Sequence, residues 1–134
     1  MSLAPIVLFV YNRPAHTRKV IEALTQNKLF SKSRLFIYSD GFKNDDDKKE
    51  VILVRELIEN FDFGTKPEII KSNHNLGLSS SIINGVTEIF QFYEDAIILE
   101  DDILTSPCFL TFMNEALNRY KDDTKVWHIS GWNY

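Results

Sequence analysis

The chain has 134 residues, of which 44% are hydrophobic and 25% charged, and this composition fits one globular domain with a substantial core. A net charge of −4 and the absence of a basic stripe exclude the charge pattern of a nucleic-acid-binding protein. The longest apolar run, residues 4–11, is too short to span a bilayer, and no signal peptide precedes it. One cysteine excludes an internal disulfide. We therefore expect a cytoplasmic protein with no transmembrane segment and no nucleic-acid partner.

Strands and helices alternate along the first half of the sequence. Residues 5–11 form an apolar run that predicts a buried strand, and Pro14 suits the first position of the helix that follows. Residues 35–38 predict a second strand. The three aspartates at 45–47 predict the start of a second helix, because negative charge is favoured at that end of the helix dipole.

The same alternation continues in the second half. A short strand is predicted around residues 68–71, followed by a loop at 73–77 and a helix with apolar residues at Ile82, Val86, Ile89 and Phe90. The wholly apolar residues 96–99 predict a strand buried on both faces. Ser106-Pro107 predicts the start of a fourth helix, and residues 126–129 predict a last strand.

This order predicts an α/β fold with a mostly parallel sheet. Right-handed crossovers place every loop that follows a strand at the same edge of such a sheet. Polar residues gather in these loops, at Asn12-Arg13, Ser39-Asp40-Gly41, residues 73–77 and Glu100-Asp101-Asp102. Ligands of open α/β sheets bind at this edge, so the sequence predicts a binding site there.

The acidic triplet Glu100-Asp101-Asp102 is the most informative of these loops. Three adjacent carboxylates repel one another unless a cation or hydrogen-bond donors neutralise them, and Mg²⁺ prefers carboxylate and phosphate oxygens. The alternative interpretation is a solvated acidic turn. No G-x-G-x-x-G follows the first strand and no G-x-x-x-x-G-K-[ST] occurs, which argues against Rossmann dehydrogenases and P-loop NTPases.

The other strand ends also allow two interpretations each. Asp40 is a candidate to accept a hydrogen bond from a nucleobase or ribose, or it is a turn residue before Gly41. Asn12 and Arg13 are candidates to contact a base or phosphate, or they are a helix cap and a solvated arginine.

Four segments together resemble the successive motifs of the nucleotide-diphospho-sugar transferase fold of family-2-type glycosyltransferases. They are residues 4–13, 35–42, 75–85 and 97–102. Residues 99–107, with Ile129-Ser130-Gly131-Trp132-Asn133, resemble more specifically the N-acetylglucosaminyltransferases that initiate complex N-glycans. The resemblance implies a three-layer α/β/α fold of the GT-A, Rossmann-like type, with a mostly parallel twisted sheet that is incomplete here.

The resemblance also implies a function and a role for each residue. It implies a metal-dependent enzyme that transfers a sugar from a nucleotide-diphospho-sugar, with a UDP-sugar as the expected donor, to a hydroxyl of a saccharide or other acceptor. Asp102 would bind Mn²⁺ or Mg²⁺ in a DXD-like motif, Asp101 would contact ribose or donor sugar, and Glu100 would contact the donor sugar. Asp40 would read the base, with Arg13 and Asn12 lining its pocket.

The family's catalytic base lies downstream of the Trp-Asn segment, so we expect it beyond Tyr134. Residues 1–134 are then a single donor-binding part of a catalytic domain, inactive alone, with apolar surface around Trp127 and Trp132 that favours self-association. The alternative is a non-catalytic nucleotide-sugar binding module or an inert truncated domain. A haloacid-type phosphotransferase or phosphatase is disfavoured, because its nucleophilic aspartate would end the first strand, where this chain has Tyr11-Asn12-Arg13.

Overall fold

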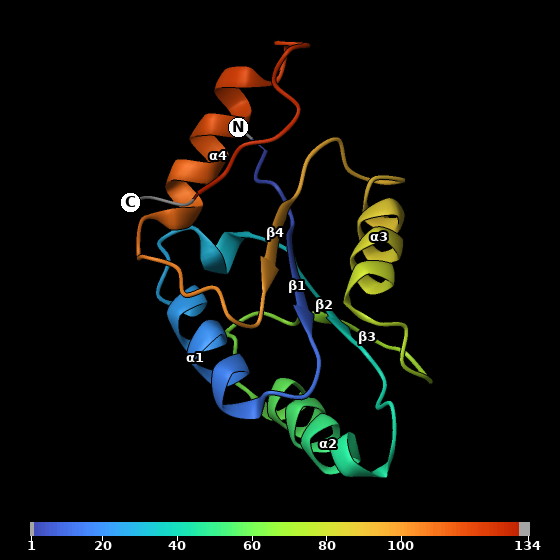
Figure 1. Ribbon diagram of the computed structural model, residues 1–134. Coiled ribbons are helices and arrows are strands. Elements are labelled where there is room, and N and C mark those ends of the chain that lie inside the picture. The colour runs from blue at the N-terminus through green and yellow to red at the C-terminus, as the bar shows by residue number, and fades with distance from the viewer. Residues whose placement is uncertain (1, 132–134) are drawn as a thin grey trace.

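The computed structural model describes residues 2–131 and contains the predicted alternation of strands and helices (Figure 1). In chain order the elements are β1 (Ile6–Val10), α1 (Pro14–Thr25), the short 3₁₀ helix η1 (Phe30–Lys32), β2 (Leu35–Ser39), α2 (Asp45–Asn60), β3 (Glu68–Lys71), α3 (Leu78–Ile89), β4 (Ile97–Glu100) and α4 (Phe109–Tyr120).

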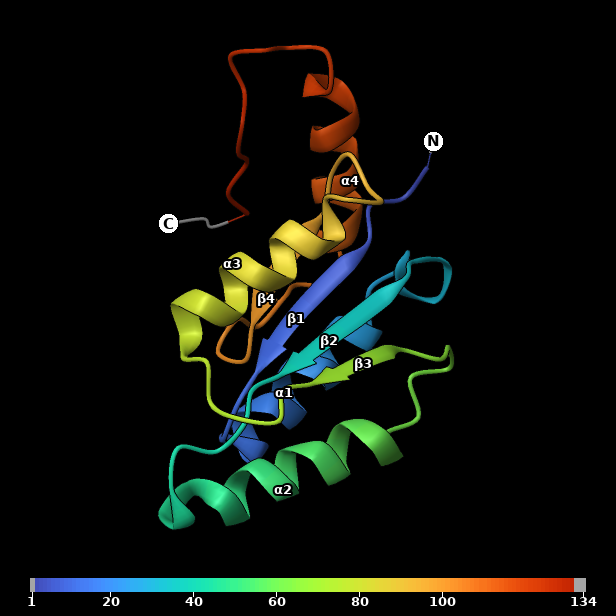
Figure 2. The same cartoon turned by 90° about the vertical axis from the view of Figure 1, so that its right-hand side faces the viewer.

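The described strands form one parallel sheet in the order β3-β2-β1-β4 (Figure 2). In this register Leu8 of β1 lies opposite Ile37 of β2 on one side and Leu99 of β4 on the other. The chain builds the sheet outward from β1 to β3, and α3 then carries it across to β4 on the far side of β1. The strand order therefore reverses between β1 and β4, and this is the point where open α/β sheets bind ligands.

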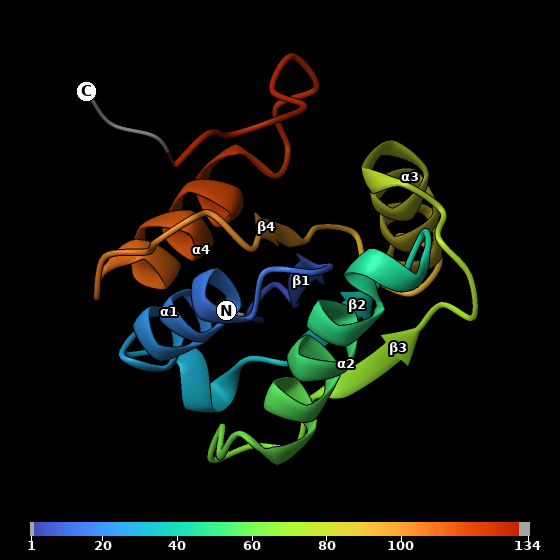
Figure 3. The same ribbon diagram turned by 60° about the horizontal axis from the view of Figure 1, so that its bottom comes forward.

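Helices cover both faces of the sheet, as the fold prediction required (Figure 3). One face packs against α1, α2 and α4 in a large core that includes Leu8, Ile37 and Leu99. The other face packs against α3 alone, around Val7, Phe9, Phe36 and Ile89. Because a single helix covers this second face, Ile98 is only half-buried, whereas the sequence predicted a strand buried on both faces.

A proline, a local capping box and a hydrogen bond from a residue distant in the sequence fix the starts of three helices. Pro14 opens α1 as predicted, and Asn44 caps α2 in a reciprocal capping box with Asp47. The predicted start of α4 at Ser106-Pro107 is early, since the helix begins at Phe109. The buried Asn27 at the end of α1 supplies the cap, because its Oδ1 accepts a hydrogen bond of 2.9 Å from the amide of Leu110.

The predicted strand at residues 126–129 is wrong. The segment follows a turn in which the Val126 amide donates to the Asp123 carbonyl, and it pairs with no strand among residues 2–131. Trp127 is 92% exposed, although Ile129 packs partly against the large core. An alternating apolar pattern predicts a strand only where a partner strand is within reach. No helix among the described residues has the length and apolarity needed to cross a membrane.

Candidate functional site at the carboxyl edge of the sheet

A cavity of about 290 Å³ lies at the carboxyl edge of the sheet, where the polar loops meet. Its lining comes from the ends of β1, β2 and β4 and from the start of α3. The lining residues are Phe9, Val10, Tyr11, Asn12, Arg13, Asp40, Lys43, Asn75, Gly77, Leu78, Ser81, Glu100 and Asp101.

Five of the six residues that the sequence singled out line this cavity, namely Asn12, Arg13, Asp40, Glu100 and Asp101. The expectation that strand ends distant in sequence lie at one edge is therefore confirmed, and the cavity adjoins the junction of β1 and β4. The sixth residue, Asp102, is not part of the lining, and its side chain is 53% exposed. The ligand-binding roles assigned to these residues stay predictions.

An ion pair joins the two strands at this junction. The guanidinium of Arg13, after β1, donates to the carboxylate of Asp101, after β4, whose side chain is only 9% exposed. Asp102 Oδ2 lies 3.9 Å from the same nitrogen. The hydrogen bond to Asp101 and the neighbouring negative charges raise the pKa of Arg13 above its ordinary value, against a smaller opposing effect of burial. Arg13 therefore pairs with the charge of Asp101 and leaves the other two carboxylates of the triplet largely uncompensated.

Asp40 is buried, with only 7% of the residue exposed, and its carboxylate is bound from four sides within the protein. Its Oδ1 accepts hydrogen bonds from the amides of Gly41 (2.8 Å) and Leu76 (2.9 Å). Its Oδ2 accepts from the amide of Gly77 (3.0 Å) and from Nδ2 of Asn75 (3.1 Å). Asp40 thus ties the end of β2 to the loop between β3 and α3.

Arg55 is a residue of this edge that the sequence reasoning missed. Its guanidinium reaches from α2 to Ser39 Oγ (3.1 Å) and to the carbonyl oxygens of Ser39 (3.3 Å), Asp40 (3.2 Å) and Ser72 (2.7 Å). Arg55 therefore holds the ends of β2 and β3 together. An available signal was its place beside Val54 on the buried side of an amphipathic helix, where an unpaired arginine is rare.

The start of α3 presents backbone donors at this cavity. Gly77 precedes the helix with φ at 81°, a conformation that favours glycine, and no side chain caps the helix start. Leu78 and Ser81 in the first turn line the cavity, and the buried Ser81 Oγ has no hydrogen-bond partner among the described residues. An uncapped helix start with free amides favours an anion.

The described residues do not form a preassembled metal site. Within residues 2–131, no group of three or more His, Cys, Asp or Glu side chains converges closely enough to hold a metal ion. Asp101 is engaged by Arg13, so Asp102 is the member of the triplet whose carboxylate is most open to solvent. A divalent cation here would need most of its ligands from water and the phosphates of a bound substrate, an arrangement common for Mg²⁺.

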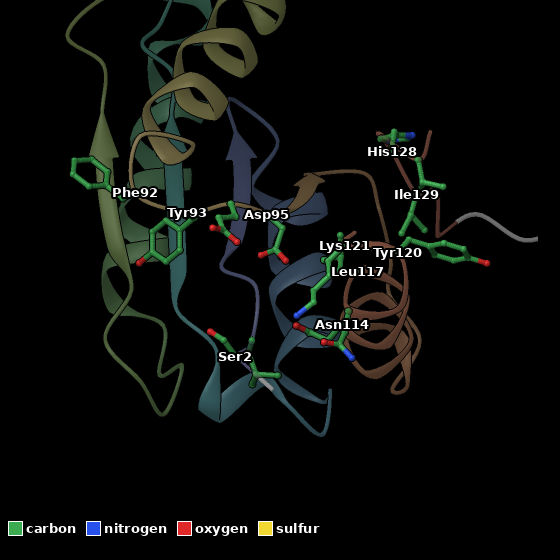
Figure 4. Close-up of a pocket in the computed structure, with 14 residues that line it drawn as sticks. Ser2, Phe92, Tyr93, Asp95, Asn114, Leu117, Tyr120, Lys121, His128 and Ile129 are labelled. Carbon is green, nitrogen blue, oxygen red and sulfur yellow. The ribbon is translucent and has the colours of Figure 1, made fainter. Parts of the chain in front are cut away.

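A larger cavity, of about 570 Å³, lies at the opposite end of the sheet (Figure 4). Its walls are the segment before β4, the end of α4 and the C-terminal segment. Figure 4 shows Asp95 and Lys121 on different walls of this cavity. Burial, followed by the nearby Glu94 charge, raises the pKa of Asp95. Volume alone does not make this the candidate site, since none of the loops at the carboxyl ends of the strands reaches it.

Comparison with known proteins agrees with the fold. No protein-family model matches the sequence. Among solved structures the chain is similar to S. aureus TarS, a glycosyltransferase, with a TM-score of 0.60 at 9% sequence identity. The match covers 90% of this chain and 20% of the TarS chain, so the protein spans about one fifth of that structure. The protein therefore has a Rossmann-like α/β fold with a parallel sheet, which it shares with part of TarS.

Proposed function

We propose that this chain forms the donor-binding part of a glycosyltransferase site and takes a nucleoside-diphosphate sugar, with UDP as the nucleotide. The observation that carries the proposal is the cavity at the β1–β4 junction, where Asn12, Arg13, Glu100 and Asp101 meet although they come from distant parts of the chain. The likeness to a glycosyltransferase fold supports this reading of the cavity. The closer resemblance to N-acetylglucosaminyltransferases of N-glycan synthesis stays a prediction.

The cavity suits an anionic, hydroxyl-rich ligand. The amides at the start of α3 and the guanidinium of Arg13 supply positive potential for a diphosphate. In the proposal Glu100 accepts hydrogen bonds from hydroxyls of the donor sugar, and Asn12 contacts the base or a phosphate. Asp101 contacts the ribose or donor sugar once the diphosphate competes with it for Arg13.

Metal dependence forms a further part of the proposal and involves Asp102. Its exposed carboxylate would hold Mn²⁺ or Mg²⁺ together with oxygens of the diphosphate. Such a cation stabilises negative charge on the leaving diphosphate. Transfer also needs a general base that takes the proton from the acceptor hydroxyl while its oxygen displaces the nucleoside diphosphate from the sugar carbon. The expectation that this base lies beyond Tyr134 stays a prediction.

Calorimetric titration with UDP tests the proposal. We expect tighter UDP binding with Mn²⁺ than with EDTA, and we expect Asp102→Ala to remove most of that difference. Asp122→Ala, which removes another exposed carboxylate that does not line the cavity, is the matched control and should behave like the wild type. Equal UDP affinity with and without metal would refute the metal assignment, and no UDP binding by a folded sample would refute the donor site. UDP-sugar binding by the full-length protein without transfer to any acceptor would identify a binding module instead.

A further inference from the structure

We propose that Asp40 is a positioning residue, which fixes the loop Asn75-Leu76-Gly77 as a wall of the donor cavity and does not itself read the nucleobase. The inference deepens the proposed function, and only its nucleotide-binding half rests on that function. Its structural half concerns the protein without any ligand.

The carboxylate of Asp40 has its acceptor positions filled by donors of the protein. A carboxylate has about four acceptor positions, two on each oxygen. Asp40 uses four within the protein, from the amides of Gly41, Leu76 and Gly77 and from Nδ2 of Asn75, at 2.8–3.1 Å. A base N–H could bind to Asp40 only by displacing one of these donors, which would lose a hydrogen bond to a charged group. The direct base contact expected from the sequence is therefore the less favourable use of this carboxylate.

Two further contacts show that the loop is built around Asp40. Nδ2 of Asn75 also donates to the Gly41 carbonyl at 2.8 Å. The Asn75 side chain therefore binds both residues that follow β2, Asp40 and Gly41. A Cβ at Gly41 would lie 2.5 Å from the carbonyl carbon of His74, so the backbones at residues 41 and 74 touch. Only glycine allows such an approach at position 41.

The loop in turn shapes the cavity and the start of α3. Asn75 and Gly77 line the cavity directly, and Gly77 is the residue that precedes the helix in a left-handed conformation. Its amide is held by Asp40 Oδ2 at 3.0 Å, which fixes where the helix begins and where its free amides lie. Loss of the Asp40 carboxylate should therefore affect a ligand through its phosphates and ribose, whatever base it carries.

Amide hydrogen exchange in the ligand-free protein tests the structural half. In the wild type the Leu76 and Gly77 amides should be protected, although they lie in a loop. The Ser79 and Ser80 amides, in the uncapped first turn of α3, should exchange quickly and serve as an internal control. This comparison needs no variant, so it holds even if substitutions at position 40 impair folding.

Asp40→Asn is the conservative variant, because the amide keeps the shape but offers one acceptor oxygen in place of two. We expect exchange at Leu76 and Gly77 to become about tenfold faster or more, since hydrogen bonds to charged groups are the stronger ones. Asp46→Asn makes the same chemical change on the exposed start of α2 and should leave both amides protected. Unprotected Leu76 and Gly77 amides in the wild type, or unchanged exchange in a folded Asp40→Asn protein, would overturn the proposal.

Binding of UDP and CDP to the same variants tests the nucleotide half. Uracil has an imide N–H that cytosine lacks, so a direct reader of the base should matter for UDP alone. We expect Asp40→Asn to weaken UDP and CDP by the same factor, within about threefold, as loss of a shared wall requires. A loss confined to UDP would overturn the proposal. If the wild type binds neither nucleotide, the proposed function fails while amide exchange still decides the role of Asp40.

Discussion

Replacement of Arg55 by methionine should destabilise the protein through the carboxyl edge of the sheet. Methionine keeps an unbranched apolar stem of similar reach and removes the guanidinium. Two contacts of Arg55 use separate donors, from Nε to Ser39 Oγ at 3.1 Å and from Nη2 to the Ser72 carbonyl at 2.7 Å. The contacts of Nη2 with the carbonyls of Ser39 and Asp40, at 3.3 and 3.2 Å, share that nitrogen and add less.

Two charge-assisted hydrogen bonds at about 1.5 kcal/mol each give a loss of roughly 3 kcal/mol in the free energy of unfolding. With a typical urea dependence of about 1–3 kcal/mol per M, this lowers the unfolding midpoint by roughly 1–3 M. Urea denaturation followed by circular dichroism measures it, and an unchanged slope would show that the unfolded state is not altered.

Arg18→Met is the matched control, because Arg18 lies exposed on α1 and forms a surface ion pair with Glu22 at 3.7 Å, one turn further along. Such surface pairs contribute about 0.3 kcal/mol. If Arg55→Met were no less stable than Arg18→Met, the hydrogen bonds of Arg55 would not hold the two strand ends together and the reasoning would fail.

Three further substitutions test other contacts. Gly41→Ala should cost about 1–3 kcal/mol in urea denaturation, because the added Cβ would lie 2.5 Å from the His74 carbonyl carbon and must push backbone aside. Burial, with nearby carboxylates, raises the pKa of Tyr38 to about 12. The wild type should therefore lose stability between about pH 10 and pH 12, and Tyr38→Phe should lose less. Burial also raises the pKa of Asp95, so Asp95→Asn should be more stable than the wild type at pH 7, and melting curves at pH 3 should show a smaller difference.

The elements that the sequence predicted well are those whose signals are local. The apolar runs that became β1 and β4 need no knowledge of their neighbours, and Pro14 marks a helix start by its own ring geometry. Alternation of these elements was enough to place the loops at one edge of a parallel sheet. The prediction of a strand at 126–129 was wrong because strand formation depends on a distant partner strand, which a local pattern does not reveal.

The roles of site residues depend on pairings that a linear pattern does not contain. Arg13 and Asp101 are 88 positions apart, and nothing in either loop indicates that the arginine neutralises the acid. Asp40 and Gly77 are 37 positions apart, so a turn aspartate and a base reader were both open interpretations. The hydrogen-bond pattern adds a third one, in which the carboxylate organises a distant loop.

The path of the chain through α3 explains why Arg13 and Asp101 have a different role from Asp40. Because α3 carries the chain from β3 across to β4, the strand order reverses between β1 and β4. The charged pair Arg13–Asp101 lies just after these two strands. Asp40 stands at the end of β2, one strand further away, where the loop that enters α3 must pass. A ligand centred on the junction would meet Arg13 and the acidic triplet first. Asp40 lines the same cavity, but its carboxylate is already bound to the amides of that loop. We therefore expect substitutions in the loops after β1 and β4 to change the electrostatic potential of the cavity. Substitutions around Asp40 should change the shape of the cavity.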